Sequence, residues 1–170
     1  MSSPGASYLG SMNTPQPRHR HASPKGCRSC ALHVTGALPK TTQQWASVRE
    51  FEASSFTDAL AGLSTTELSA AFARFNDKVE QARLGKLRFG RGEWFDVDSM
   101  DCTEDVLELK WKDLPPRAKK RGLWLRLYFS EPDLDPGLLL QLNLECKTAD
   151  RAAQDQAARK AQARLEAHYA

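Results

Sequence analysis

The fold is decided by residues 106–147, which contain VLELKW (106–111), LWLRLYFSE (123–131) and LLLQLNLECK (138–147). Apolar and polar residues alternate in all three segments. A period of two is typical of strands whose sheet has one packed face and one solvent face. The links between the segments are short enough for antiparallel pairing. The sequence therefore predicts an antiparallel sheet of three to four strands.

Each predicted strand presents a row of apolar side chains to one face of the sheet. The rows are Leu107, Leu109 and Trp111, then Leu125, Leu127 and Phe129, then Leu138, Leu140, Leu142 and Leu144. The other face carries Lys110, Arg126 and Lys147, with Trp124 and Tyr128 among them. We expect the leucine face to form the core and the basic face to stay open.

Helices are expected before these strands. A short strand over 45–52 precedes a first helix over 56–63. A second helix starts at Ser64, because Ser64 and Glu67 have the spacing of a capping box, and Gly85 supplies its end. We expect the two helices to form an antiparallel hairpin on the leucine face. The fold class is therefore α+β.

The end of the chain predicts one more helix, which starts near Thr148 and runs for about twenty residues. It is rich in alanine, and its only large apolar residues are Leu165 and Tyr169. We expect its packing to be weak or to be completed by a partner. Residues 86–105, between the hairpin and the strands, are punctuated by Gly and Asp and are expected to be irregular.

Residues 1–42 are rich in Ser, Pro, Gly, Arg and His, and we predict a disordered leader followed by one domain over 43–170. The natural start is Met1, Met12 or a later residue. A Cys-x-x-Cys pair in this leader, Cys27 and Cys30, is preceded by two histidines, and a zinc site is the alternative to a disordered tail. Its ligands are His19, His21, Cys27 and Cys30.

The charge of the chain is unevenly distributed. The formal net charge is +3, from 24 basic and 21 acidic residues. Five basic and no acidic residues precede Thr42, so the remainder has 24 − 5 = 19 basic and 21 acidic residues, or −2. The domain must therefore concentrate positive charge locally to bind nucleic acid.

The cysteine spacing predicts no disulfide framework. The absence of an apolar span or a signal segment favours a cytoplasmic protein without a membrane partner.

In its order of elements and the wording of its strands, the chain resembles the RelE/ParE toxin superfamily, especially the HigB-like and phage-derived RelE-like branches. The resembling segments are FTDALAGLSTTELSAAFARFNDKV, DVLELKW, LWLRLYFSEP and the final LLLQLNLECK with its helix. The resemblance covers roughly residues 45–170. It implies the toxin half of a type II toxin–antitoxin pair, with a helix-turn-helix or small helical antitoxin as partner.

In that family the open sheet face binds messenger RNA on the ribosome and promotes cleavage by the RNA's own 2′-hydroxyl, without a cofactor. The resemblance implies that Arg126 clamps the phosphate, with Lys110 and Lys147 in support. Tyr169 or His168 would transfer the proton, and Trp124 or Tyr128 would stack a base. The basic link residues Arg117, Lys119, Lys120 and Arg121 are either a solvated loop or a contact with ribosomal RNA or an acidic antitoxin.

Two carboxylates distinguish this chain from members of the family that it resembles, which often end the last strand in a run of lysines. Glu108 and Glu145 share the basic face, and either can form a cross-strand ion pair with Arg126 or serve as a general base. These carboxylates leave a catalytically inactive protein-binding module as an alternative to a nuclease. The resemblance to the ParE branch implies a further alternative, a gyrase inhibitor.

Overall fold

The computed structural model describes residues 27–52, 60–112, 114–117, 124–147 and 149–170. Within these residues the chain forms a five-stranded sheet with the strand order β1-β5-β4-β3-β2. The strands are β1 (Gln44–Ser47), β2 (Val97–Ser99), β3 (Leu107–Trp111), β4 (Trp124–Ser130) and β5 (Leu138–Lys147). The helices are α1 (Ala31–Thr35), α3 (Thr65–Arg83) and α5 (Arg151–His168). The predicted α+β class and the three long strands are confirmed.

The strands β2 to β5 pair antiparallel in sequence order, and β1 pairs parallel with β5. A parallel partner requires a long crossover, and α3 lies in the segment that connects β1 to the rest of the sheet. The strand β2 lies within residues 86–105, which the sequence analysis expected to be irregular. That expectation is wrong, because three residues are enough to pair with the edge of β3.

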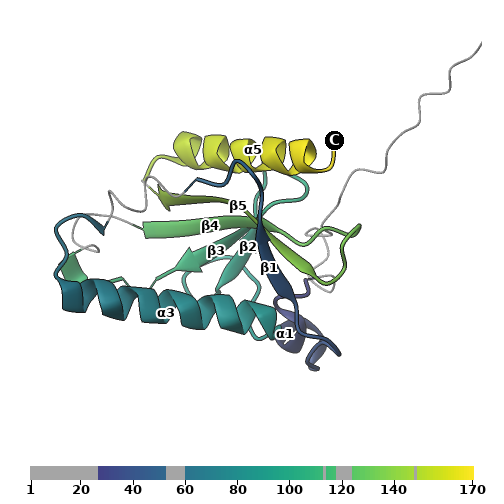
Figure 1. The fold of residues 1–170 in the computed structure, drawn as a ribbon, viewed down its shortest axis with the longest axis horizontal. Helices are drawn as coiled ribbons and strands as arrows, with labels where there is room; N and C mark the ends of the chain where they lie inside the picture. Colours follow the sequence, from purple (N-terminus) through teal and green to yellow (C-terminus); the bar gives the residue numbers. More distant parts are fainter. Residues whose placement is uncertain (1–26, 53–59, 113, 118–123, 148) are drawn as a thin grey trace, which may run out of the picture.

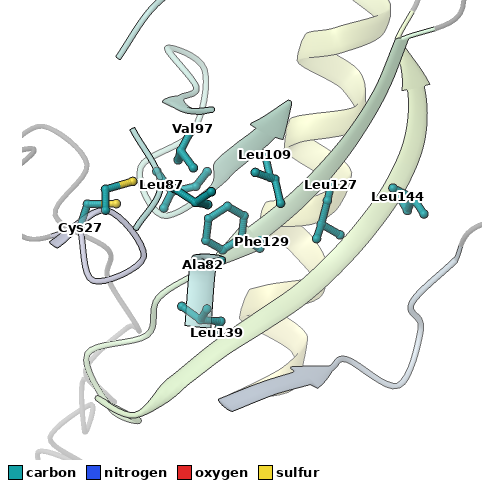
Figure 2. Packing of buried hydrophobic residues seen from close by; sticks show 11 residues of the cluster. Cys27, Ala82, Leu87, Val97, Leu109, Leu127, Phe129, Leu139 and Leu144 are labelled. Atoms are coloured by element: carbon teal, nitrogen blue, oxygen red, sulfur yellow. The ribbon is translucent and has the colours of Figure 1, made fainter. Parts of the chain in front are cut away.

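The sheet carries a long helix on each face: α3 covers one face and α5 covers the other (Figure 1). On the α3 side, Leu109, Leu127 and Phe129 gather near Ala82 of α3 (Figure 2). On the α5 side, Leu140 and Leu142 pack with buried alanines of α5. The expectation of one fully open face is therefore wrong for the part of the sheet beneath α5.

The alanine-rich helix packs firmly because its small side chains allow close approach to the sheet. Ala158, Ala161 and Leu165 of α5 have no exposed surface in the described structure. Arg164, which is also buried, donates hydrogen bonds to the Leu142 carbonyl at 3.0 Å and to Asn143 Oδ1 at 2.9 Å. The expectation of weak packing overlooked these contacts, since it counted only large apolar residues.

The predicted helical hairpin is also wrong, because α3 is the single long helix on its side of the described sheet. Half of the expected first helix, residues 56–59, lies outside the described residues. Its described end turns at Gly62, where φ is 82°, and leads into α3. The capping box of Ser64 and Glu67 is confirmed, and α3 ends before Gly85, whose φ of 71° favours glycine.

Part of the predicted leader belongs to the fold. Residues 27–42 include α1, and the side chains of Cys27 and Cys30 are buried in the core beneath the sheet. Arg28 fixes this segment, because its guanidinium donates to Gln43 Oε1 at 3.0 Å and to the Leu138 carbonyl at 2.9 Å. The predicted boundary at residue 42 is therefore too late. Residues 1–26 lie outside the described chain.

A bulge in β5 decides which residues face α5. Tyr128 of β4 pairs with Asn143, but the next residue, Phe129, pairs with Gln141, so Leu142 is an extra residue in β5. Leu142 packs toward α5, and Asn143 also bonds Arg164 of that helix. The sequence analysis placed Leu144 on the same face as Leu142. The bulge reverses this placement, since it shifts the alternation by one residue.

Candidate functional site

A pocket of about 720 Å³ opens where α5 does not cover the sheet, beyond the first turns of that helix. Its walls come from β2, β3, β4, the end of β5, the start of α5 and the loop before β2. Its charged and aromatic lining residues are Arg91, Glu93, Asp98, Asp101, Glu108, Lys110, Trp111, Lys112, Trp124, Arg126, Lys147, Arg151 and Asp155. Four predicted site residues, Lys110, Trp124, Arg126 and Lys147, meet in this pocket.

Arg126 lies on the pocket floor and forms an ion pair with Glu108 of the neighbouring strand. Both side chains are buried, with exposed fractions of 7% and 5%. Arg126 Nη1 also donates to the Leu125 carbonyl at 2.9 Å. The two residues are diagonal neighbours on β4 and β3, a position from which long side chains reach each other. The cross-strand ion pair that the sequence allowed is therefore present, and it borders the pocket.

Lys110 contacts the loop before β2, which forms the rim of the pocket. Its ammonium lies 3.6 Å from a carboxylate oxygen of Asp98 and donates to the carbonyls of Gly90 at 3.4 Å and Gly92 at 3.1 Å. Burial lowers the pKa of Lys110, and the charge of Asp98 opposes this effect. The ammonium is engaged by one carboxylate and two carbonyls. Lys110 therefore holds the loop before β2 in place, and its charge is already paired with Asp98.

Lys147 and Trp124 stand side by side at the ends of β5 and β4, where they are register partners. The Lys147 ammonium lies 5.9 Å from the centroid of the Trp124 ring, and Trp124 is 41% exposed. No carboxylate of the described residues forms an ion pair with Lys147. Burial lowers the pKa of Lys147, and the nearby charge of Arg126 lowers it further. Among the four predicted residues that line the pocket, Lys147 is the most accessible cation and Trp124 is the aromatic ring.

Tyr128 does not take part in the site, because α5 seals it. Only 1% of its surface is exposed, and its ring packs with the α5 core cluster. Burial raises the pKa of Tyr128, and the charge of Glu108 adds to this effect. The prediction that Tyr128 stacks a base is therefore wrong, since no ligand reaches a ring beneath the helix.

The two proton-transfer candidates lie at the wrong end of the molecule. Tyr169 follows the last residue of α5, and its hydroxyl donates to Asp135 Oδ2 at 2.5 Å, in the turn that precedes β5. The pocket lies at the opposite ends of both elements. An eighteen-residue helix is about 27 Å long. His168 is exposed beside Tyr169. Neither residue can contact a phosphate at Arg126, so their predicted catalytic roles are wrong.

The remaining predicted residues do not join the pocket. Arg117 is exposed and lies near Glu67, at the start of α3. The hydrogen bond from the Ser64 backbone is the main cause that lowers the pKa of Glu67, and the charge of Arg117 is a smaller one. Lys119, Lys120 and Arg121 lie outside the described residues. So do His19 and His21 of the possible zinc site.

The described part of the possible zinc site does not resemble a metal centre. Cys27 and Cys30 are free thiols, and Cys27 Sγ donates to Glu131 Oε1 at 3.6 Å. Burial is the main cause that raises the pKa of Cys27, which disfavours the thiolate that zinc needs. In the described chain, no group of three or more His, Cys, Asp or Glu side chains is arranged to hold a metal ion.

The sequence analysis missed the acidic half of the pocket. Asp98 faces Lys110, and Arg91 Nη2 lies 2.7 Å from Asp101 Oδ1. Asp101 also lies 3.7 Å from Arg151 at the start of α5. The lining has six basic and five acidic side chains, so its charge is nearly balanced. The only sequence signal was the acidic segment DVDSMD, and its meaning depends on the pairing of β2 with β3.

We find no match to this chain among protein-family models, curated proteins or solved structures. None of the helices in the described ranges is long and apolar enough to cross a membrane. The function is therefore inferred from the geometry of the site.

Proposed function

We propose that this protein is a RelE/ParE-like toxin that cleaves messenger RNA at the pocket around Arg126 and Lys147. The observation that carries the proposal is the convergence of Arg126, Lys147, Glu108 and Trp124 on one pocket of about 720 Å³. Part of the order of elements also supports it, because a first strand, antiparallel strands and a C-terminal helix follow one another as in the resembling family, while one long helix stands where the family's helical hairpin was expected.

The chemistry requires a base, cations and an acid at one phosphate. The 2′-oxygen attacks phosphorus while Glu108 accepts its proton, and the bond from phosphorus to the 5′-oxygen breaks. The products are a 2′,3′-cyclic phosphate and a 5′-hydroxyl end. Arg126 and Lys147 stabilise the extra negative charge of the phosphorane. Lys147, whose pKa is lowered by burial, donates the proton that the leaving 5′-oxygen needs.

The ion pair between Glu108 and Arg126 fits this assignment. It holds the Glu108 carboxylate against the Arg126 guanidinium at the pocket, so a phosphate bound by Arg126 would lie beside a possible proton acceptor. The phosphate of the substrate would then share Arg126 with Glu108. Trp124 stands next to Lys147 and offers a partly exposed ring to the base beside that phosphate.

The test is induced expression in a bacterial host with mapping of the 5′ ends of messenger RNA. The wild type is expected to arrest growth and create new 5′-hydroxyl ends. Arg126→Ala and Lys147→Ala are expected to abolish both effects. The second variant is included because Arg126→Ala leaves the buried Glu108 without its ion-pair partner and can destabilise the fold. Circular dichroism spectra check that each variant folds.

The matched control is Lys86→Ala, which removes an exposed lysine outside the pocket. This variant is expected to cleave like the wild type. Unchanged 5′ ends on induction of the wild type would contradict the nuclease. Growth arrest that survives both pocket variants would point to a gyrase inhibitor instead.

A second candidate is the catalytically inactive protein-binding module. The near balance of charge in the pocket favours it, because Lys110, Arg126 and Arg91 already have carboxylate partners. This candidate predicts no growth arrest and no cleavage. It also predicts that Trp124→Ala, which removes an exposed ring, weakens capture of a protein partner encoded beside this gene.

A further inference from the structure

Trp94 is the most exposed large apolar side chain of the described residues, with 72% of its surface in solvent. It directly follows Arg91, Gly92 and Glu93, which line the rim of the pocket. The Arg88 guanidinium lies 4.7 Å from the centroid of its ring. A single exposed apolar residue needs no explanation by itself. An exposed indole that lies against an arginine, next in sequence to the rim of a pocket lined by charged and aromatic side chains, does need an explanation.

The loop that carries Trp94 is fixed by several contacts. The Gly90 N–H donates to the Val97 carbonyl at 2.9 Å, and Lys110 Nζ donates to the Gly92 carbonyl at 3.1 Å. Lys112 Nζ, at the end of β3, donates to the Glu93 carbonyl. Gly90 packs so closely on Phe95 that an added Cβ would lie 2.7 Å from the ring. The backbone on either side of Trp94 is therefore fixed, and the Arg88 guanidinium is the group that lies against its ring.

We propose that Trp94 and Arg88 form a second stacking platform, which binds an unpaired base of the RNA strand whose phosphate occupies the pocket. The proposal rests on the proposed function and extends it to the substrate. Trp124 would stack the base next to the phosphate, and Trp94 would stack a base further along the strand. Exposed aromatic rings beside basic groups bind single strands, because the bases of a duplex already stack on each other. The substrate is therefore single-stranded RNA of at least several nucleotides.

Binding is measured with a fluorescein-labelled 2′-O-methyl RNA hexamer, which cannot be cleaved because its 2′-oxygens are blocked. Trp94→Ala is expected to weaken binding of the hexamer about 5- to 150-fold, the range that base–aromatic stacking gives. Trp94→Phe, which keeps an aromatic face, is expected to retain most of the affinity. Binding of a single nucleoside monophosphate is expected to be unchanged in both variants, because it reaches only the pocket.

The matched control is Leu134→Ala, which removes another exposed apolar side chain in the turn before β5. It is expected to bind the hexamer like the wild type. Hexamer affinity that is unchanged by Trp94→Ala, or duplex RNA that binds as tightly as the hexamer, would overturn the proposal. If the wild type cleaves RNA and Trp94→Ala does not change the affinity for the hexamer, the stacking platform is refuted and the nuclease is not. A wild type that binds the hexamer through Trp94 without cleaving RNA refutes the nuclease alone.

Discussion

The two ends of the β4–β5 hairpin both contain buried charges, but they use them differently. At the turn end, Glu131 accepts backbone N–H groups of Arg28 at 2.5 Å and Ser29 at 2.9 Å. Arg28 in turn donates to several backbone carbonyls of the turn. At the pocket end, Arg126 of β4 pairs side chain to side chain with Glu108 of the neighbouring strand β3, and both residues line the pocket. Figure 1 shows α5 spanning both ends.

The difference separates structural charges from candidate functional ones. A charge that is satisfied by backbone groups cannot exchange partners without breaking the fold. A charge that is satisfied by another side chain beside a pocket can share that partner with a ligand, because the pocket supplies space and solvent. We therefore expect substitutions at the turn end to reduce stability and substitutions at the pocket end to reduce activity.

The largest effect is expected for Glu108→Gln. Removal of the general base should slow RNA cleavage by about 10²- to 10⁴-fold, while the amide keeps an acceptor for Arg126. Cleavage of a labelled single-stranded RNA measures the rate. Glu145→Gln is the matched control, because Glu145 is the register partner of Arg126 but does not line the pocket. Equal losses in the two variants would contradict a special role for Glu108.

The next effect is expected at the turn end. Glu131→Ala should lower the free energy of unfolding by about 3 kcal/mol, because it leaves the buried N–H groups of Arg28 and Ser29 without this acceptor. Urea denaturation measures the loss. Glu104→Ala, which changes an exposed carboxylate, should alter stability by less than about 0.5 kcal/mol. A stable Glu131→Ala protein would show that the N-terminal segment does not depend on this contact.

A third prediction concerns Asp96, a buried carboxylate that is bonded by Lys78 at 2.6 Å and by the backbone N–H of Arg88 at 3.0 Å. Burial opposes its ionisation, but the hydrogen bonds of Lys78 and Arg88 lower its pKa below the usual value. The folded state therefore binds this proton less readily than the unfolded state. The stabilisation is present above about pH 4 and is lost as the pH falls below that value.

Asp96→Asn is therefore expected to be less stable at pH 7 by about 1–3 kcal/mol and to lose less stability between pH 5 and pH 3 than the wild type. Thermal unfolding across this pH range measures both effects. Asp77→Asn, at an exposed position on α3, serves as the control and should follow the wild type. If the unfolding temperatures of the Asp96 variant and the wild type fall equally between pH 5 and pH 3, Asp96 does not contribute to acid sensitivity.

The smallest effect is expected for Tyr169→Phe. The variant loses the hydrogen bond to Asp135, so the free energy of unfolding should fall by about 1 kcal/mol. Its RNA cleavage should match the wild type, because Tyr169 lies at the turn end. A large loss of cleavage with normal stability would revive the catalytic role that the resemblance implied. The same assays on His168→Ala extend the test.

The sequence predicted the parts of the fold that depend on local patterns. The alternation of β3 and β4 gave the correct faces for Leu109, Leu127 and Arg126, and the capping box gave the start of α3. The bulge at Leu142 left no local signal, because alternating leucines continue through it. The placement of α5 was equally hidden, since alanines mark a close helix contact only when the facing surface is known.

The gathering of Lys110, Trp124, Arg126 and Lys147 was predictable because neighbouring antiparallel strands bring same-face residues together. The acidic partners Asp98 and Asp101 were not, because they come from a short edge strand and its loop. Tyr169 was misplaced for a similar reason. Its distance from Arg126 depends on the direction in which α5 crosses the sheet.

The sequence by itself determined the three long strands, the start of α3 and the row of basic and aromatic side chains, because periodicity and capping act between residues that are close along the chain. Only the tertiary structure decided which of these side chains remain accessible. The path of α5 buries Tyr128, carries Tyr169 away and leaves Lys147 and Trp124 at the edge of a pocket. Accessibility is set by contacts between distant segments, and those contacts depend on the packing of the whole chain.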